Sequence, residues 1–279
     1  MKIAITGATG FIGRHVISQL TKKSDDFVTI VRTLDKREVP LPKDKVLFLD
    51  IHTPPINAYE LMGCPDVLIH LAWGGLPNYK SLHHFETELP AHYRFLKELI
   101  QSGLQSLVIT GTCFEYGMQS GPLSENLPSR PYNPYGYAKD ALRQQLEYLK
   151  IENTFNLTWL RLFYTYGAGQ GPTSLYSQLC TSVARGDKTF NMSGGEQLRD
   201  YLHVSDVASS IVDLALQARD CGIINICSGK PVSIRKLVEG WIHENGWNIE
   251  LDLGRYPYPE YEPMAFWGTR YKLNSYLIC

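Results

Sequence analysis

Short apolar runs alternate with longer amphipathic stretches along the first 165 or so residues. Short runs rich in β-branched residues predict buried strands, and apolar positions spaced three and four apart predict helices. This alternation predicts βαβ units around a parallel sheet, which is a doubly wound, Rossmann-like α/β fold. The expected strands are residues 3–6, 27–32, 46–50, 67–71 and 107–110, and the expected helices are residues 11–23, 83–102 and 138–153.

The pattern becomes less regular after about residue 165. Glycines 167, 169 and 171 and Pro172 crowd one loop, and strand-like runs return only at 201–204 and 223–227. We interpret this half as a smaller, loop-rich C-terminal substrate lobe interleaved with the end of the sheet. The predicted division is a dinucleotide-binding domain of residues 1–165 plus about 200–228, and a lobe of residues 166–199 and 229–279.

Composition narrows the class of protein. A chain of 279 residues with 44% hydrophobic and 20% charged residues is ordinary for a globular protein. The net charge of −1 gives no reason to expect nucleic acid or a membrane surface as a partner, and no apolar run is long enough to span a bilayer. The chain enters its first strand directly, without a signal peptide, and its six cysteines show no metal-ligand spacing. We therefore expect a reduced, cytoplasmic protein without a bound metal.

A glycine-rich turn joins the first expected strand to the first expected helix. Gly7, Gly10 and Gly13 permit a tight turn, a close approach of a pyrophosphate and close packing of the helix on the strand. The amino end of the helix also offers free N–H groups and a positive dipole end to phosphates. The residues expected to contact a dinucleotide here are Gly7, Thr9, Gly10, Phe11, Ile12 and Gly13.

The end of the second strand indicates which dinucleotide binds. A carboxylate at this place holds the ribose 2′-OH of NAD, whereas an arginine accommodates the 2′-phosphate of NADP. The strand ends at Arg32, and Lys36 and Arg37 follow closely. We therefore predict NADP(H), with NAD(H) as the alternative because Asp35 lies in the same turn and Arg32 can also be a solvated surface cation.

Two later strand ends complete the expected cofactor cleft. Asp50 and Ile51 follow the third strand and are expected beside the adenine. Leu71 and Ala72 follow the fourth strand and are expected to form a wall of the cleft. Ligands of open parallel sheets bind at these carboxyl ends, which is why the residues are grouped.

Tyr135 and Lys139 form a candidate acid/base pair. Residues four apart on a helix share one face, and a nearby ammonium lowers the pKa of a phenol toward the range useful for proton transfer. The spacing alone is common by chance. Its position supports the assignment, because a strand ending in Thr110-Gly111-Thr112 lies upstream.

The ordered motifs of the chain resemble the extended short-chain dehydrogenase/reductase family, and in particular its nucleotide-sugar branch. The resemblance covers nearly the whole chain. The matching motifs are Gly7–Gly13, His70-Leu71-Ala72, Thr112 with Tyr116-Gly117, Pro134-Tyr135-x-x-x-Lys139, Arg161-Leu-Phe with Tyr166-Gly167, Arg199-Asp200-Tyr201-x-His203 and Asn225-x-x-Ser228-Gly229.

The resemblance implies a role for each matching residue. Tyr135 would transfer a proton, Lys139 would bind the nicotinamide ribose and tune Tyr135, and Thr112 would hydrogen-bond the substrate oxygen. Arg199 would contact the nucleotide phosphates, with an interlobe salt bridge involving Arg199-Asp200 as the alternative. Gln170 and Glu262 lie in the segments expected to grip the sugar and the nucleotide.

The resemblance also separates the possible reactions. Related 4,6-dehydratases carry Thr-Asp-Glu where this chain has Thr112-Cys113-Phe114, and Glu115 is one position late and expected to point away, so dehydration is disfavoured. Cys113 is expected to be a buried structural thiol. We predict NADPH-dependent reduction of a nucleotide-linked 4-dehydro-6-deoxyhexose, with dTDP-4-dehydro-6-deoxyglucose as substrate and dTDP-fucose or, after 3,5-epimerisation, dTDP-6-deoxy-L-talose as product. The alternatives are a 4-epimerase with bound NAD and a non-catalytic dinucleotide-sensing protein.

Some residues depart from the family pattern. Glu88 and Tyr164 each stand where relatives often have asparagine. His83 and His84, at the start of a helix, are expected to be solvated rather than to bind a metal. Helices 83–102 and 138–153 are expected to form a homodimer interface, as in relatives.

Overall fold

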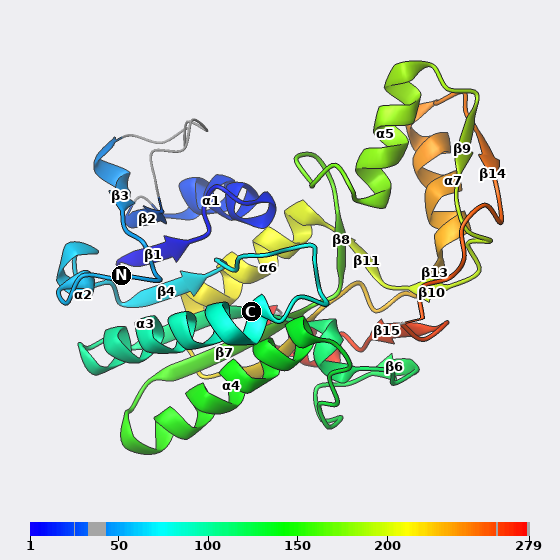
Figure 1. Cartoon of the computed structure of the whole chain (residues 1–279). Helices are drawn as coiled ribbons and strands as arrows, with labels where there is room; N and C mark the ends of the chain where they lie inside the picture. Colours follow the sequence, from blue (N-terminus) through cyan, green and yellow to red (C-terminus); the bar gives the residue numbers. More distant parts are fainter. Residues whose placement is uncertain (25, 33–42, 261, 278–279) are drawn as a thin grey trace.

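The computed structural model describes residues 1–24, 26–32, 43–260 and 262–277. Its centre is a parallel seven-stranded sheet with the order β12-β7-β5-β4-β1-β2-β3 (Figure 1), so the predicted fold class is confirmed. The order of the strands reverses beside β1, because β2 and β4 lie on its two sides. Doubly wound sheets bind their ligands at such a point of reversal. The strands are β1 (Ile3–Thr6), β2 (Phe27–Val31), β3 (Val46–Phe48), β4 (Val67–His70), β5 (Ser106–Thr112), β7 (Asn156–Leu162) and β12 (Gly222–Ile226).

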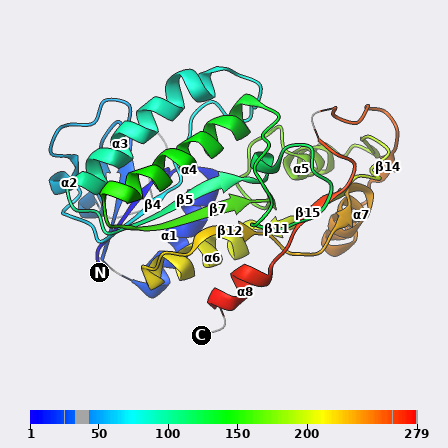
Figure 2. The ribbon, with the colours of Figure 1, turned by 90° about the horizontal axis from the view of Figure 1, so that it is seen from below.

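Helices cover both faces of the sheet (Figure 2). One layer holds α2, α3 and α4, and the opposite layer holds α1, α6 and α8. The π-helix η2 (His84–Glu88) runs directly into α3, and the 3-10 helix η3 (Cys113–Tyr116) follows β5. The helices are α1 (Phe11–Lys23), α2 (Ala58–Leu61), α3 (Leu89–Gln101), α4 (Pro134–Glu152), α6 (Val204–Gln217) and α8 (Tyr271–Leu277), and a 3-10 turn, η1 (Lys43–Lys45), precedes β3.

The alternation of side chains along each strand explains why a hydrophobic core lies on each face of the sheet. Successive side chains of a strand point to opposite faces of the sheet. Ile3 and Ile5 of β1 therefore pack in the core beneath α1 and α6, while Ala4 packs in the core beneath α3 and α4. All four residues of β1 are buried, as a strand covered on both faces requires.

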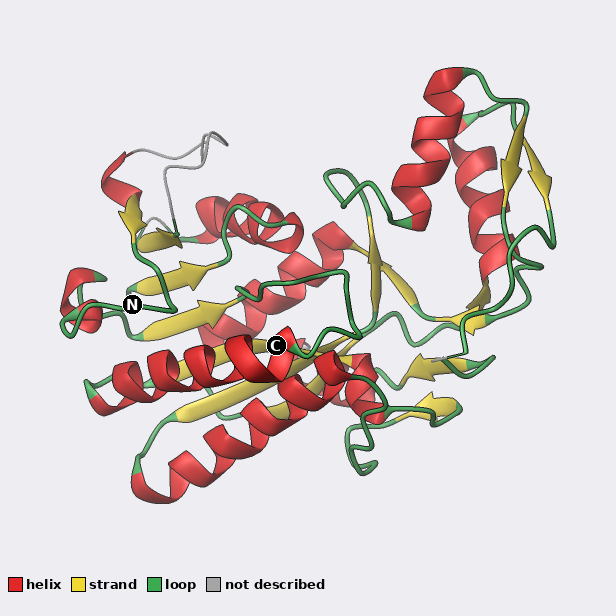
Figure 3. Cartoon of the chain, viewed as in Figure 1, coloured by secondary structure: helices red, strands yellow, loops and turns green. Residues whose placement is uncertain are grey.

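A smaller unit projects beyond the carboxyl ends of the central strands (Figure 3). Helices α5 (Leu175–Arg185) and α7 (Ile234–Asn245) pack there against β9 (Thr189–Asn191) and β14 (Glu250–Asp252), around buried residues that include Trp241. The remaining short strands connect this unit to the sheet. They are β6 (Gly121–Leu123), β8 (Tyr164–Tyr166), β10 (Leu198–Arg199), β11 (Tyr201–His203), β13 (Val232–Ser233) and β15 (Phe266–Gly268).

The second half is more regular than the pattern predicted, because it contains the helices α5, α6 and α7. The prediction missed α6, although its buried positions, which include Val204, Val207 and Ile211, recur at helical spacing. The helix predicted over 138–153 begins earlier, at Pro134, and the helix predicted over 83–102 begins with a π-turn. Within the described residues, no helix has both the length and the apolar character to cross a membrane.

Candidate active site

The glycine turn lies tightly against the end of β4. Gly7 has φ +72°, and a Cβ atom there would lie 2.6 Å from the amide nitrogen of Ala72 and 2.7 Å from the carbonyl carbon of Leu71. A Cβ at Gly13 would lie 2.2 Å from the carbonyl oxygen of Gly7. These contacts are with backbone atoms that cannot rotate away, so both positions require glycine. The turn thereby brings Gly7 beside Leu71 and Ala72, the residues expected to wall the cofactor cleft.

The amino end of α1 is suited to a diphosphate. Gly10 is the N-cap residue, and it places no side chain over the first turn of the helix. Phe11, Ile12 and Gly13 begin that turn, where backbone N–H groups have no partner within the helix. The Thr9 carbonyl accepts a hydrogen bond from Nε of Arg14 at 3.0 Å. The free N–H groups of this turn have the chemistry that the phosphates of a dinucleotide require.

The expected adenine end is described in part. Arg32 directly follows β2 and is exposed. Asp35, Lys36 and Arg37 lie outside the described residues. Oδ1 of Asp50 accepts a hydrogen bond from the backbone N–H of His52 at 3.0 Å, and the neighbouring Ile51 is buried.

Helix α4 presents the candidate acid/base pair. Oδ1 of the N-cap residue Asn133 accepts from the backbone N–H of Gly136 at 2.8 Å, which begins the helix at Pro134 and puts Tyr135 in its first turn. A Cβ at Gly136 would lie 2.7 Å from the Phe114 carbonyl oxygen, so the glycine lets α4 approach η3 closely. Tyr135 and Lys139 are both buried and lie one helical turn apart.

Burial shapes the electrostatics of this pair. Nζ of Lys139 donates to the Thr110 carbonyl at 2.9 Å and lies 3.9 Å from the centroid of the Trp73 ring. Burial lowers the pKa of Lys139 to about 7, and the negative charges of Glu115 and Glu88 partly oppose that shift. Burial raises the pKa of Tyr135, and the nearby Thr112 partly opposes the increase. The expected lowering of the Tyr135 pKa by Lys139 is therefore not found in this structure, because burial of the phenol outweighs it.

Thr112 is held by the turn that follows β5. Its hydroxyl accepts from the Phe114 N–H at 3.2 Å, and its own N–H donates to Oε1 of Glu115 at 2.8 Å. This reciprocal arrangement is a capping box at the start of η3. Thr112 and Tyr135, 23 positions apart in the sequence, are thereby brought close enough to interact.

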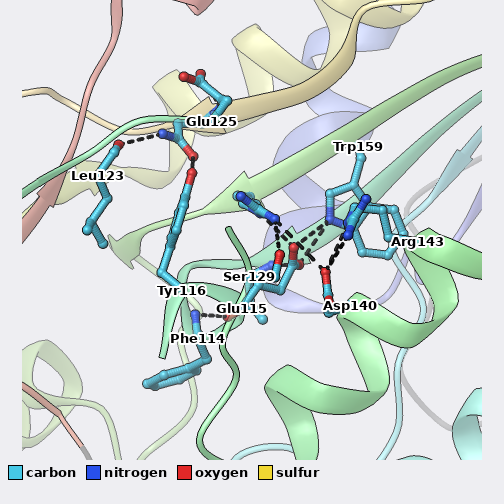
Figure 4. A network of polar contacts seen from close by, with 12 residues as sticks. Phe114, Glu115, Tyr116, Leu123, Glu125, Ser129, Asp140, Arg143 and Trp159 are labelled. Carbon is cyan, nitrogen blue, oxygen red and sulfur yellow. Dashed lines mark hydrogen bonds and ion pairs between the residues drawn. The ribbon is translucent and has the colours of Figure 1, made fainter. Parts of the chain in front are cut away.

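Glu115 belongs to a buried network rather than to the reacting centre (Figure 4). Its Oε2 accepts from Nε of Arg161 at 2.7 Å, and its Oε1 accepts from the indole N–H of Trp159 at 2.9 Å. A hydrogen bond from Arg161 to Ser129 at 2.6 Å extends the network. Glu115 is turned inward because η3 follows β5 at once, and not because of strand alternation. Neighbouring Cys113 is buried, as expected.

The expected substrate residues are found in two places. Arg199 and Glu262 pair with each other, with Nη2 of the arginine 2.9 Å from Oε2 of the glutamate. Asp200 accepts instead from the backbone N–H groups of Ser228 and Gly229, so the arginine's ion pair is with Glu262. Nε2 of Gln170 donates to the Thr165 carbonyl at 2.7 Å, and among the described residues its buried Oε1 has no hydrogen-bond partner. That oxygen is therefore an acceptor to which neither a described protein group nor solvent donates a hydrogen bond.

A second buried network lies beneath the expected cofactor site, and the sequence analysis missed it. Glu88 is its centre; His52, His83 and His92 contact it, and His70 joins through His92. Burial opposes ionisation of Glu88, but hydrogen bonds from His92, the Gly74 N–H and His52 hold its pKa well below the usual range. Burial lowers the pKa of His92 to about 4. The one signal in the sequence that pointed to this network is that Glu88 stands where relatives often have asparagine.

The expectation that both His83 and His84 are solvated is wrong for His84. Its side chain is buried because the Trp73 indole N–H donates to its Nδ1 at 3.1 Å and its Nε2 pairs with the Asn78 carbonyl at 2.8 Å. Its ring also contacts Tyr135, with centroids 5.2 Å apart. His84 is therefore part of the wall around the candidate proton donor.

Comparisons with known proteins identify the family. Residues 3–227 match the NAD dependent epimerase/dehydratase family, and the chain belongs to that family. The resemblance to extended short-chain dehydrogenase/reductases is thereby confirmed. Members of this family act as enzymes on nucleotide sugars with a nicotinamide dinucleotide.

Individual relatives narrow the comparison. The dTDP-6-deoxy-L-talose 4-dehydrogenase (NAD(+)) of Aggregatibacter actinomycetemcomitans is 31% identical over 97% of this chain and 100% of that protein. The GDP-6-deoxy-D-talose 4-dehydrogenase of the same organism is 25% identical over 86% of this chain and 78% of that protein. The solved structure of MoeE5 in complex with UDP-glucuronic acid and NAD is 26% identical, with a TM-score of 0.82 over 99% of this chain and 92% of that chain.

Proposed function

We propose that the protein is a 4-ketoreductase of nucleotide-linked 4-dehydro-6-deoxyhexoses, acting reversibly as a 4-dehydrogenase. The observation that carries the proposal is the buried Tyr135, which lies near Thr112 and shares a helix face with Lys139 at the carboxyl edge of the sheet. A non-catalytic dinucleotide sensor has no use for this combination of acid, cation and hydroxyl.

The protein's own groups would act on the sugar carbonyl. Thr112 and Tyr135 would hydrogen-bond the C4 oxygen, and Tyr135 would give it a proton as the carbonyl becomes an alcohol. The Lys139 ammonium would stabilise the phenolate left on Tyr135, which bulk water would then reprotonate. A bound nicotinamide dinucleotide supplies the hydride to C4 in this direction and accepts it in the reverse direction. Glycines 7, 10 and 13, with Leu71 and Ala72, would hold that cofactor.

The substrate proposal rests on the strand end and on the relatives. Elimination of water needs an added acid and base, whereas Cys113 and Phe114 supply neither after Thr112. Both Aggregatibacter relatives named above are 4-dehydrogenases of 6-deoxytaloses. We therefore infer dTDP-4-dehydro-6-deoxyhexose as the substrate, and the first relative favours the 3,5-epimerised form and dTDP-6-deoxy-L-talose as product.

Within this proposal, the unit beyond the sheet holds the nucleotide sugar. Residues 166–199 and 229–279 would form the substrate lobe, and residues 1–165 with about 200–228 would form the cofactor domain. The unpartnered Oε1 of Gln170 would accept from a substrate hydroxyl. Arg199, neutralised by Glu262, would contact the phosphates only after that ion pair rearranges.

We propose NADP(H) as the preferred cofactor, although the Aggregatibacter enzyme's name specifies NAD(+). Arg32 is a cation, and no acid lies on β2. The Arg32→Ser variant should raise KM for NADPH at least about tenfold and leave KM for NADH within about twofold, because only NADPH carries the 2′-phosphate. Lys22→Ala, an exposed cation at the far end of α1, is the control. Equal effects on both cofactors would contradict the assignment.

A homodimer is the proposed assembly. The side chains of Tyr137, Tyr148 and Ile151 are large, apolar and exposed on α4, and α3 packs beside that helix. A surface of this kind is typical of a subunit contact. Light scattering should give the mass of two chains for the wild type and of one chain for Tyr148→Glu.

We also place the protein in the cytoplasm. The five described cysteines are free thiols, which is typical of a reducing compartment.

Product analysis tests the substrate proposal. Incubation with the 3,5-epimerised dTDP-4-keto sugar and NADPH should yield dTDP-6-deoxy-L-talose, identified by the C4 configuration in NMR spectra. A 4-epimerase regenerates its cofactor and consumes no reductant. Interconversion of 4-epimers by protein that retains NAD, without added reductant, would replace our proposal with the epimerase.

A further inference from the structure

Glu88 collects an unusual number of donors for a buried acid. It lies at the end of η2, and its side chain is 3% exposed. Its Oε2 accepts from the Gly74 N–H at 2.6 Å and lies 3.1 Å from Nε2 of His92. Its Oε1 lies 3.0 Å from Nε2 of both His52 and His83. A glutamine matches it poorly while His52 and His83 direct N–H groups at this side chain, because an amide has one acceptor oxygen and adds two N–H groups of its own.

One arm of the network leads to the glycine turn, where the pyrophosphate is expected. Because the Glu88 carboxylate can only accept, His92 donates through Nε2 and accepts at Nδ1, which lies 2.7 Å from Nε2 of His70. His70 then accepts at Nδ1 from the Thr6 hydroxyl, 2.8 Å away. Thr6 directly precedes Gly7, so the charge on Glu88 sets the proton direction up to the glycine turn.

A second, shorter connection runs directly from Glu88 toward the expected nicotinamide end. The Gly74 N–H binds Glu88 directly, and this ties down the segment that follows Leu71 and Ala72. Trp73, between Ala72 and Gly74 in the sequence, stacks on His92 with ring centroids 4.6 Å apart. The Lys139 ammonium lies over the face of the same Trp73 ring. The wall of the nicotinamide pocket is thus fixed to the acid.

The other arm leads to the expected adenine end. His52 faces Glu88 with Nε2 and Asp50 with Nδ1, 3.2 Å from its Oδ1. Asp50 and Ile51 are the residues expected beside the adenine. The segments after β3 and β4 therefore bind one carboxylate directly, and the end of β1 is linked to it through His70 and His92.

We propose that Glu88 is a positioning residue that holds the adenine and nicotinamide ends of the dinucleotide site in register. The inference rests on the dinucleotide site of the proposed function, and it does not depend on the identity of the sugar. Loss of the carboxylate leaves the donors of both arms competing for one oxygen, so the two half-sites move independently. Binding of a ligand that touches both ends should then suffer more than binding of a ligand that touches one.

Calorimetry on the full-length protein tests the proposal with two probes, the complete dinucleotide and 5′-ADP. For Glu88→Gln we expect Kd to rise at least about tenfold for the dinucleotide and no more than about threefold for 5′-ADP. The matched control is His83→Ala, which removes a donor to the same Oε1 from a side chain that is 41% exposed and lies outside both arms. It should leave both constants within about twofold.

The ratio of the dinucleotide Kd to the 5′-ADP Kd separates a positioning role from a loss of fold. Partial unfolding lowers the number of binding sites per chain, but it leaves that ratio unchanged. His52→Ala, at a loop residue, cuts the adenine arm alone and should weaken both probes by similar factors of about three to five. Equal weakening of both probes by Glu88→Gln, or unchanged dinucleotide binding, overturns the inference. Tight dinucleotide binding by a wild type that reduces no keto sugar would overturn the proposed substrate and leave this inference intact.

Discussion

The ion pair of Glu115 and Arg161 offers a stringent test of how the site is supported. The two side chains are 0% and 1% exposed, and no water can replace either partner. The Glu115→Gln variant keeps the shape and one oxygen but removes the charge. The new amide N–H groups then meet the N–H donors of Arg161, Trp159 or Thr112.

The expected magnitude follows from the remaining contacts. Removal of one partner of a buried ion pair costs about 3–5 kcal/mol because the other charge stays buried without compensation. Asp140 lies 4.0 Å from Nη2 of Arg161 and offsets part of that cost. We therefore expect a loss near the lower limit, about 3 kcal/mol of the free energy of unfolding.

Urea unfolding followed by circular dichroism measures this loss as a shift of the midpoint at constant slope. Glu147→Gln is the matched control, because Glu147 pairs with Arg143 at 2.7 Å but is 47% exposed, and its loss should cost less than about 1 kcal/mol. Replacing both buried partners, as in Glu115→Leu with Arg161→Met, should cost less than Glu115→Gln alone. A loss for Glu115→Gln no larger than that of the control would refute the reasoning.

Three further predictions address the site itself. Tyr135→Phe should lower kcat about 10²–10⁴-fold and leave dinucleotide Kd within about twofold, as measured by stopped assays and calorimetry; near-normal turnover contradicts the acid role. Because the pKa of Lys139 is lowered to about 7, the ammonium is present below that pH and lost above it, so kcat/KM for reduction should fall on the alkaline side. The Lys139→Arg variant keeps a positive charge at higher pH, so the alkaline fall of kcat/KM should move to higher pH. If the fall does not move, it belongs to the titration of another group. Gly7→Ala places a Cβ 2.6 Å from the Ala72 nitrogen and should weaken dinucleotide binding at least about tenfold, whereas Gly240→Ala, with open space around its Cβ, should bind normally.

The first βα unit could be predicted to the residue, because its signals are local. The strand at Ile3–Thr6 and the helix at Phe11–Lys23 were both predicted with the observed bounds, since the intervening glycines permit only a tight turn. Alternation predicted a parallel sheet and the strands β1 to β5 and β12, but it missed the interior strand β7. Helix α6 could also have been predicted, because its buried residues and its polar Asp206, Ser209 and Asp213 recur at helical spacing.

The site was predicted less evenly. Tyr135, Lys139 and Thr112 were selected from spacing and resemblance, and the fold brings them together. The network around Glu88 was missed because its members come from four separate segments, and no spacing in the chain links His52, His70 and His92. His84 was misjudged for a related reason, since its partner Trp73 is supplied by another loop. The pairing of Arg199 with Glu262 likewise depends on tertiary contact.

The most direct measurement is the loss of absorbance in the reduced-nicotinamide band when purified protein is mixed with dTDP-4-dehydro-6-deoxyglucose, or with its 3,5-epimerised form, and with NADPH or NADH in turn. Tyr135→Phe, which retains the cofactor site, serves as the blank. We predict stoichiometric oxidation by the wild type, faster with NADPH, and almost none by the variant. No oxidation of either cofactor with either sugar would contradict the assignment as a 4-ketoreductase.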